Sequence, residues 1–258
     1  MHRSILILSF FFLLMLGRSQ NNPVLVNAVS NAPVRCAVLD GENHIINEAN
    51  GFIIRKKNHY YFITNYHIIE DTNYYSGIVH PFYDNGAIAV PAALSLRSRR
   101  KKDGSWGTQK IILFKNGKPN FYRMTFGTKA GDVMACKIDD SSAFNYYPLD
   151  YSAATEYKLN SGDEIFLVGY PISIKSNPSV RNGKVIETDS IATTYQGKLP
   201  MFLIDLSSPG WYSGSPAFLW NKTLNKAVLI GIIGNADEES NTAVWKISFL
   251  SEMIKTLP

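Results

Sequence analysis

The chain has 258 residues and a mass of 28.9 kDa, which is enough for one large domain or two small ones. Hydrophobic residues make up 45% of the sequence and charged residues 18%, a composition typical of a globular protein rather than a disordered one. Two cysteines are too few for a disulfide scaffold, and neither a zinc-binding His-Glu-x-x-His motif nor a glycine-rich phosphate loop occurs. We therefore expect no metal and no cofactor.

Residues 1–19 have the pattern of a secretory signal peptide. Arg3 precedes an apolar run at residues 5–16, and the small residues Gly17 and Ser19 follow it. This run is shorter than the roughly 20 residues that a membrane-spanning helix needs. We predict cleavage near Ser19, a secreted or periplasmic location, and no stable membrane insertion afterwards. A short buried helix is the alternative.

The net charge argues against nucleic acid as a partner. The formal charge of the full chain is +5, and removal of the two arginines in residues 1–19 leaves a small positive charge on the mature chain. One strongly basic cluster stands at residues 97–102, just before an Asp-Gly turn signal. We interpret it as a solvated loop tip, with contact to an acidic partner or an anionic surface as the alternative.

Short apolar or alternating runs, closed by turn dipeptides, recur along most of the chain. This pattern, with 12% aromatic residues, predicts an all-β sandwich or barrel rather than alternating strands and helices. The runs are residues 34–39, 51–54, 60–64, 110–114, 133–138, 164–169, 183–187, 201–206, 227–233 and 243–247. The turn dipeptides between them are at 40–41, 50–51, 85–86, 116–117, 161–162 and 182–183. Helical spacing of apolar residues predicts one short terminal helix at 248–257, and the polar segment 139–159 fits a linker between two barrels.

Three segments carry candidate catalytic residues, each at the end of a predicted strand or in a tight turn. They place His67 after the run 60–64, Asp132 at the mouth of the run 133–138, and Ser213 beside Gly214 in a turn. A serine hydroxyl needs a base to become a nucleophile, and histidine can take and return its proton near neutral pH. A buried carboxylate would orient that histidine, and backbone N–H groups near the serine would stabilise an oxyanion. Each of the three segments is weak evidence alone, but their occurrence together in the order histidine, aspartate, serine is specific.

These segments resemble motifs of the trypsin-like serine peptidases of chymotrypsin fold, in their bacterial branch. TNYHII at 64–69 is similar to the histidine motif of heat-shock-type periplasmic serine proteases, and DVMACKI at 132–138 to their aspartate segment. SGSP at 213–216 matches the serine motif of glutamyl endopeptidases, and the resemblance extends over most of the mature chain. It implies two packed six-stranded antiparallel β-barrels, at 20–145 and 146–258, with a short C-terminal helix.

The resemblance implies a serine endopeptidase that cleaves polypeptides through His67, Asp132 and Ser213. The family usually has glycine two residues before the nucleophile, whereas this sequence has Trp211 there and Gly210 one residue earlier. Either the loop carries an extra residue, or Trp211 supplies the oxyanion N–H in a conformation that bulky residues disfavour. A trypsin-like fold with a silent site that acts as a binding module is therefore the alternative function.

The residues that would bind substrate are only partly readable from the sequence. The resemblance places the base of the specificity pocket at Ser207, or at Leu206 if the loop is longer, and one wall near Gly234. Gly210, Trp211 and Gly214 would border the oxyanion site. Substrate preference and oligomeric state stay open. Two interpretations also stay open for the cysteines, which either pair or remain as two buried thiols.

Overall fold

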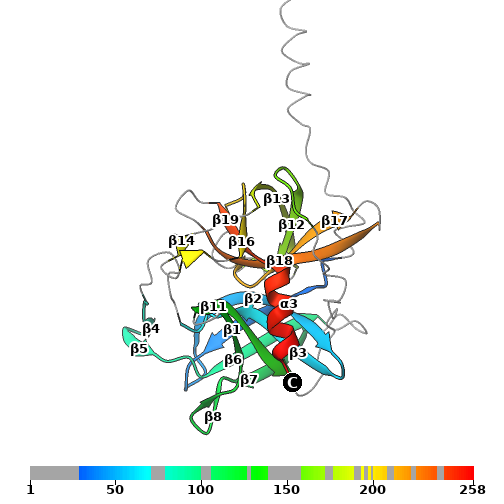
Figure 1. Cartoon of the computed structure of the whole chain (residues 1–258). Coiled ribbons are helices and arrows are strands. Elements are labelled where there is room, and N and C mark those ends of the chain that lie inside the picture. The colour runs from blue at the N-terminus through cyan, green and yellow to red at the C-terminus, as the bar shows by residue number, and fades with distance from the viewer. Residues whose placement is uncertain are drawn as a thin grey trace, which may run out of the picture.

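The computed structural model describes residues 29–70, 79–99, 106–126, 129–138, 158–171, 177–188, 193–194, 197–198, 200–207, 212–221, 225–236 and 241–258. They form two β-units, one above the other in Figure 1, and helix α3 (Ile247–Thr256) runs beside both. The predicted signal peptide at 1–19 and residues 139–157 of the predicted linker lie outside the described residues. No helix in the described part of the chain is long and apolar enough to cross a membrane.

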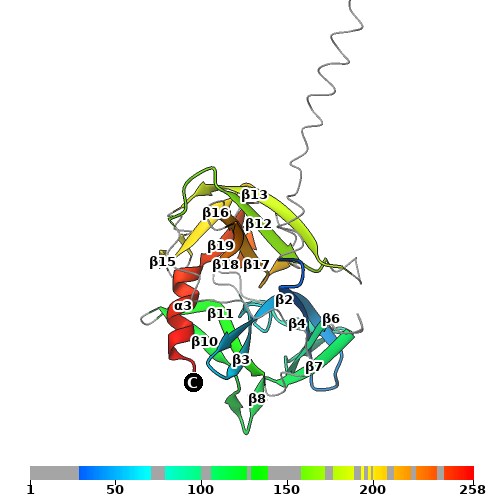
Figure 2. The ribbon, with the colours of Figure 1, turned by 90° about the vertical axis from the view of Figure 1, so that its right-hand side faces the viewer.

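The first unit is a seven-stranded antiparallel sheet that curls round on itself, as Figure 2 shows. Its strand order is β10-β11-β3-β2-β1-β6-β7, with two small hairpins, β4–β5 and β8–β9, attached. The strands of the sheet are β1 (Pro33–Leu39), β2 (Ile45–Lys56), β3 (His59–Asn65), β6 (Ala93–Arg99), β7 (Trp106–Ile112), β10 (Tyr122–Phe126) and β11 (Lys129–Ile138). The hairpin strands are β4 (Phe82–Asp84), β5 (Ala87–Ala89), β8 (Phe114–Lys115) and β9 (Lys118–Pro119).

The second unit is a closed six-stranded antiparallel barrel with the strand order β12-β13-β16-β19-β18-β17. Its strands are β12 (Glu164–Gly169), β13 (Ser179–Glu187), β16 (Met201–Ile204), β17 (Pro216–Asn221), β18 (Lys226–Ala236) and β19 (Thr242–Lys246), and a small hairpin joins β14 (Thr193–Thr194) to β15 (Gly197–Lys198). The all-β class, the closed second barrel and the terminal helix are as predicted. The sheet of the first unit has one strand more than the expected six, with β10 and β7 at its two edges.

Of the predicted turn dipeptides, two close hairpins and two others lie within strands. Asn85-Gly86 and Asn116-Gly117 do close hairpins, and both residues of each pair have positive φ. Asn50-Gly51 lies inside β2 and Asn182-Gly183 inside β13. Gly51 is required there by crowding, because a Cβ at that position would overlap the Phe62 ring and the Ile63 carbonyl oxygen. A glycine that admits a close neighbour and a glycine that makes a turn look alike in a sequence.

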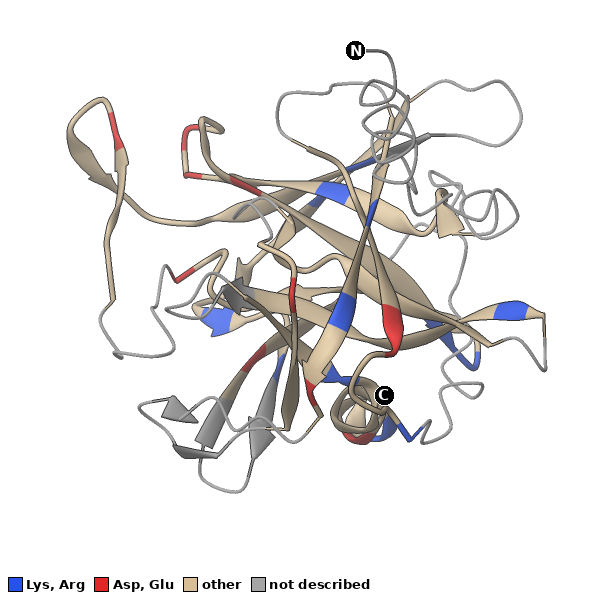
Figure 3. Cartoon of the chain, turned by 90° about the horizontal axis from the view of Figure 1, so that it is seen from above, with Lys and Arg blue, Asp and Glu red and all other residues tan. Residues whose placement is uncertain are grey.

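The charged side chains of the described segments are mixed in sign. In the ribbon of Figure 3, positions of basic and acidic residues lie interspersed along the described segments. The predicted basic loop tip is partly a strand, because Arg97 lies within β6. The Arg97 guanidinium lies over the Trp106 ring, 4.5 Å from its centroid. Residues 98 and 99 of the cluster also lie in β6, and residues 100–102 lie outside the described residues.

Each unit has a hydrophobic core of its own, and residues of both units form one further, shared cluster. The shared cluster contains Phe52 and Ile63 from the first unit, Trp245 from the barrel, and Leu250 and Ile254 from α3. The Trp245 ring stacks on Phe249 of the helix at 5.8 Å. Burial of apolar surface contributes about 25 cal/mol per Å², so this cluster holds the barrel and the helix against the first sheet.

The end of α3 is also fixed to the first unit by hydrogen bonds. The Lys56 ammonium donates to the Lys255 carbonyl at 2.9 Å and to the Leu257 carbonyl, and the Tyr61 hydroxyl donates to the Pro258 carbonyl at 2.6 Å. A cation is favourable at this end because the last carbonyls of a helix lack partners within it. The helix that continues the second barrel is thereby capped by the first sheet.

Ile254→Ala should lower the free energy of unfolding by about 2–5 kcal/mol, because it opens a cavity in the shared core. Glu252→Ala on the same helix should change it by less than about 0.5 kcal/mol, because Glu252 is exposed and its ion pair with Lys255 lies on the surface. Urea denaturation of both variants measures the difference. Equal effects would show that α3 does not pack into the core as described.

Both cysteines are free thiols buried in the core of the first unit. Burial raises the pKa of Cys136 to about 12, and burial, followed by the neighbouring Cys136 and Glu48, raises the pKa of Cys36 well above its ordinary value. Of the two interpretations left open by the sequence, the structure has the unpaired thiols.

The buried thiols should resist alkylation in the folded protein. A pKa of about 12 leaves roughly one Cys136 side chain in 10⁴ as thiolate at pH 8, and the thiolate is the reactive form. Iodoacetamide at pH 8 should therefore label neither cysteine in native protein and both in urea, as read by intact mass. Rapid labelling of the native chain would contradict the buried, unpaired arrangement.

Candidate active site

His67 lies in the turn that follows strand β3. The strand ends at Asn65, and the Ile69 amide donates to the Tyr66 carbonyl at 3.0 Å, which closes a turn around the histidine. His67 is only 9% exposed, so most of it is shielded from solvent. The predicted placement of a histidine at the end of a strand is what the structure has.

Asp132 is held beside His67 by the pairing of β11 with β3, in which Val133 lies opposite Asn65. Its backbone carbonyl accepts hydrogen bonds from the Tyr66 amide at 3.1 Å and from Asn65 Nδ2 at 3.0 Å. The carboxylate accepts from the His67 amide at 2.9 Å and lies 2.8 Å from His67 Nδ1. At 1% exposure, this carboxylate is shielded from water, and both of its oxygens engage the histidine.

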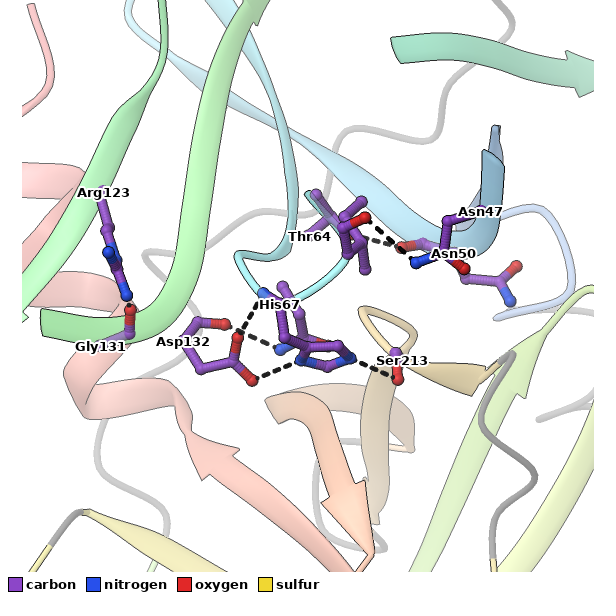
Figure 4. Close-up of polar contacts among 10 residues, drawn as sticks. Asn47, Asn50, Thr64, His67, Arg123, Gly131, Asp132 and Ser213 are labelled. Carbon is purple, nitrogen blue, oxygen red and sulfur yellow. Dashed lines mark hydrogen bonds and ion pairs between the residues drawn. The ribbon is translucent and has the colours of Figure 1, made fainter. Parts of the chain in front are cut away.

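Ser213 reaches the same place from the second unit. Its Oγ lies 3.0 Å from His67 Nε2, on the side of the ring opposite Asp132, as Figure 4 shows. Because the carboxylate accepts the proton of Nδ1, Nε2 is left as the acceptor for the serine hydroxyl. The three side chains therefore form one continuous line of hydrogen bonds that is suited to removing a proton from Ser213.

The turn around Ser213 has a conformation that requires glycine at 214. Gly214 has a φ of +80°, and a Cβ there would overlap the Asn50 carbonyl oxygen and lie within reach of Thr64 Oγ1. Its amide donates to the Ile233 carbonyl at 3.0 Å, and the Ser215 amide donates to the Tyr212 carbonyl at 2.9 Å. The turn is thus pressed tightly against the first unit at this glycine.

The structure describes three of the five residues predicted to bind substrate. Gly214 lies in the serine turn, and Gly234 lies in β18 next to Ile233, whose carbonyl holds that turn. Ser207 is exposed after β16, and its carbonyl accepts from Arg181 at 3.2 Å. Gly210 and Trp211 lie outside the described residues.

Two residues near the predicted pocket have structural roles. The Asp205 carboxylate accepts the Lys184 amide, so it acts as a strand-end acid, and Leu206 is half-buried against the barrel core. The Gly234 backbone lies close to Trp245. A Cβ at 234 would stand 3.0 Å from the indole nitrogen. Bulkier residues at 234 would therefore crowd the indole.

Several residues that sequence reasoning missed surround the histidine and the aspartate. The Arg123 guanidinium lies over the Tyr66 ring at 3.4 Å and donates to the Gly131 carbonyl at 3.2 Å, which ties the residues next to His67 and Asp132 together. Burial and the neighbouring Glu70 raise the pKa of Tyr66, while Arg123 opposes them. No spacing rule links residues 66 and 123, so only the pairing of β10 with β11 reveals this contact.

A second cluster of titratable side chains lies on the first unit. His44 Nδ1 stands 2.8 Å from Asp84 and 3.4 Å from Asp40, and the three offer metal-ligating atoms within 4.8 Å of one another. Attraction to Asp40 and then to Asp84 raises the pKa of His44. The group is exposed or half-buried, and His44 Nδ1 lies within hydrogen-bonding distance of the Asp84 carboxylate.

Comparison with known proteins decides the family. The profile of the trypsin-like peptidase domain matches residues 49–229, which is more than half of the chain. The chain belongs to the trypsin-like peptidase family. This family consists of hydrolases of the protease kind, and the matched region includes His67, Asp132 and Ser213. No curated protein sequence matches the chain significantly.

Solved structures of this trypsin-like peptidase fold resemble the chain despite low sequence identity. The MamO protease domain from Magnetospirillum magneticum in its apo form has 15% identity and a TM-score of 0.58, and the match covers 88% of this chain and 98% of that one. Deg5 has 12% identity and a TM-score of 0.56, covering 92% and 93%. The Rv3671c protease from M. tuberculosis in its active form has 14% identity and a TM-score of 0.53, covering 91% and 84%. At these identities the likeness establishes the fold.

Gly214→Ala should destabilise this trypsin-like peptidase by about 1–3 kcal/mol more than Gly162→Ala does. Both glycines have positive φ, so both variants carry a similar backbone strain, but a Cβ at 162 meets no atom within 4 Å, whereas one at 214 meets the Asn50 carbonyl. Chemical denaturation of the two variants isolates the steric effect. Equal losses would mean that the serine turn is not packed against β2.

Proposed function

We propose that this protein is a secreted serine endopeptidase that hydrolyses peptide bonds through Ser213, His67 and Asp132. The observation that supports the proposal most directly is the line of hydrogen bonds from Asp132 through His67 to Ser213, with distances of 2.8 Å and 3.0 Å. Secretion is inferred from the signal-like pattern of residues 1–19.

In the proposed mechanism, Ser213 Oγ attacks the carbonyl carbon of the scissile bond while His67 Nε2 takes the hydroxyl proton. Asp132 stabilises the imidazolium that forms, because its buried carboxylate faces Nδ1. His67 then gives the proton to the leaving amine as the C–N bond breaks, which leaves an acyl ester on Ser213. Water hydrolyses the ester by the same exchange of protons, and the serine hydroxyl is restored.

Substrate binding is proposed to use the surface beside the serine turn. Gly214 lies in the serine turn, Gly234 lies in β18 next to the Ile233 carbonyl that holds this turn, and Ser207 would be an uncharged pocket base. Gly210 and Trp211 would flank the oxyanion of the tetrahedral intermediate, which backbone N–H groups stabilise. An extended polypeptide is the substrate class that such a site would accept.

Ser213→Ala should abolish labelling by a fluorophosphonate probe and leave the circular dichroism spectrum unchanged, because it removes the nucleophile alone. Asp132→Asn should slow labelling and peptide hydrolysis by about 10³–10⁴-fold, because the histidine loses the partner that fixes its tautomer. The wild-type chain, with and without residues 1–19, serves as the reference.

The same experiment separates the enzyme from the silent binding module suggested by Trp211. A binding module would react with the probe in no form, and Ser213→Ala would leave its biological activity intact. Wild-type protein that is folded and remains unlabelled would overturn the proposed peptidase activity.

A further inference from the structure

We infer that Asn50 is a positioning residue that fixes the serine turn of the second unit against the histidine-bearing sheet of the first. The inference rests on the proposed function, because it concerns how Ser213 is brought to His67. Asn50 lies in β2, is 1% exposed, and belongs to the Asn-Gly pair whose sequence resembles a turn. Figure 4 shows it among the residues above the serine turn.

The Asn50 side chain forms a double hydrogen bond with the second unit. Its Nδ2 donates to the Tyr170 carbonyl at 3.1 Å, and its Oδ1 accepts from the Tyr170 amide at 2.8 Å. One amide side chain therefore pairs with both backbone groups of a residue that directly follows β12. Such a pair fixes direction as well as distance, because the two bonds are made at once.

The Asn50 backbone makes a third bond across the same boundary. Its amide donates to the Ser213 carbonyl at 3.0 Å, so the nucleophile residue itself is held. The Asn50 carbonyl accepts from Thr64 Oγ1 at 2.7 Å, which orients this peptide from within the first unit. The same carbonyl is the atom that excludes a side chain at 214.

These contacts converge on the hydrogen bond between His67 and Ser213. His67 and Asp132 both belong to the first unit, whereas Ser213 belongs to the second. Asn50 bonds to Tyr170 through its side chain and to Ser213 through its backbone amide. A displacement of about 1 Å between reacting groups can cost about 10²-fold in rate. Loss of the Asn50 side chain should therefore move Ser213 and leave the His67–Asp132 pair in place.

The chain offers a matched control in Asn47, three residues earlier in β2. Asn47 Nδ2 donates to the Ile68 carbonyl at 3.1 Å, so its side chain also bonds to a backbone carbonyl, but within the first unit. Asn50→Ala and Asn47→Ala remove the same atoms from the same strand. The bonds lost from the buried Asn50 cross between the units, whereas those lost from the half-buried Asn47, to Ile68 and Glu48, stay within the first unit.

The test uses the full chain and measures fluorophosphonate labelling together with the low-field proton resonance between His67 and Asp132. Asn50→Ala should label about 10²-fold more slowly, with kcat for a peptide substrate reduced more than KM changes, and should keep the resonance. Asn47→Ala should label at close to the wild-type rate. Asn50→Ala that labels as fast as wild type would overturn the inference, and so would loss of the resonance, which would indicate a general scaffold role.

Hydrogen exchange keeps the inference testable if wild-type protein proves unreactive and the proposed function fails. The amides of Tyr170, Gly214 and Ser215 should exchange faster in Asn50→Ala than in Asn47→Ala, because the side-chain pair that holds Tyr170 of the second unit to β2 is lost and the neighbouring serine turn keeps only its backbone bond to Asn50. Equal exchange at these three amides in the two variants would overturn the positioning role regardless of activity.

Discussion

The arrangement of the site depends on a hydrogen bond that crosses between the two β-units. His67 and Asp132 are neighbours through the pairing of β3 with β11, but Ser213 is carried by the barrel. Hydrogen bonds need donor–acceptor distances of about 2.7–3.2 Å and good alignment, so the two units must be held in fixed relation. The shared core around Trp245 supplies the attraction between them, and the bonds of Asn50 supply direction.

The sequence predicts much of the fold because its strands carry regular signals. The run at 164–169 coincides with β12, and the terminal helix differs from its predicted bounds by one residue at each end. In the seven-stranded sheet and the barrel, strands β6, β10 and β17 were missed, the first because Arg97 and its neighbours suggest a solvated loop. Apolar periodicity finds strands that cover a core, and it fails where charged side chains stack on aromatic rings.

The candidate triad could likewise be predicted from the sequence, because His67, Asp132 and Ser213 each occupy a strand end or turn with a distinctive local sequence. The residues that hold the triad in place could not be predicted from the sequence. Asn50 is followed by a glycine, which predicts a turn, and its partner Tyr170 is 120 residues away in the chain. When a side chain bonds to the backbone of another residue, that residue can be of almost any type. No pattern in the sequence therefore reveals such a contact.

The capping of α3 by Lys56 and Tyr61 has a topological consequence. The polypeptide passes from the first sheet to the barrel after β11, and its last residues return to the first sheet. The two units are therefore joined by the covalent connection and again by the docked C-terminal segment. A single proteolytic cut between β11 and β12 would leave a nicked but undivided molecule, with the triad still assembled from both pieces.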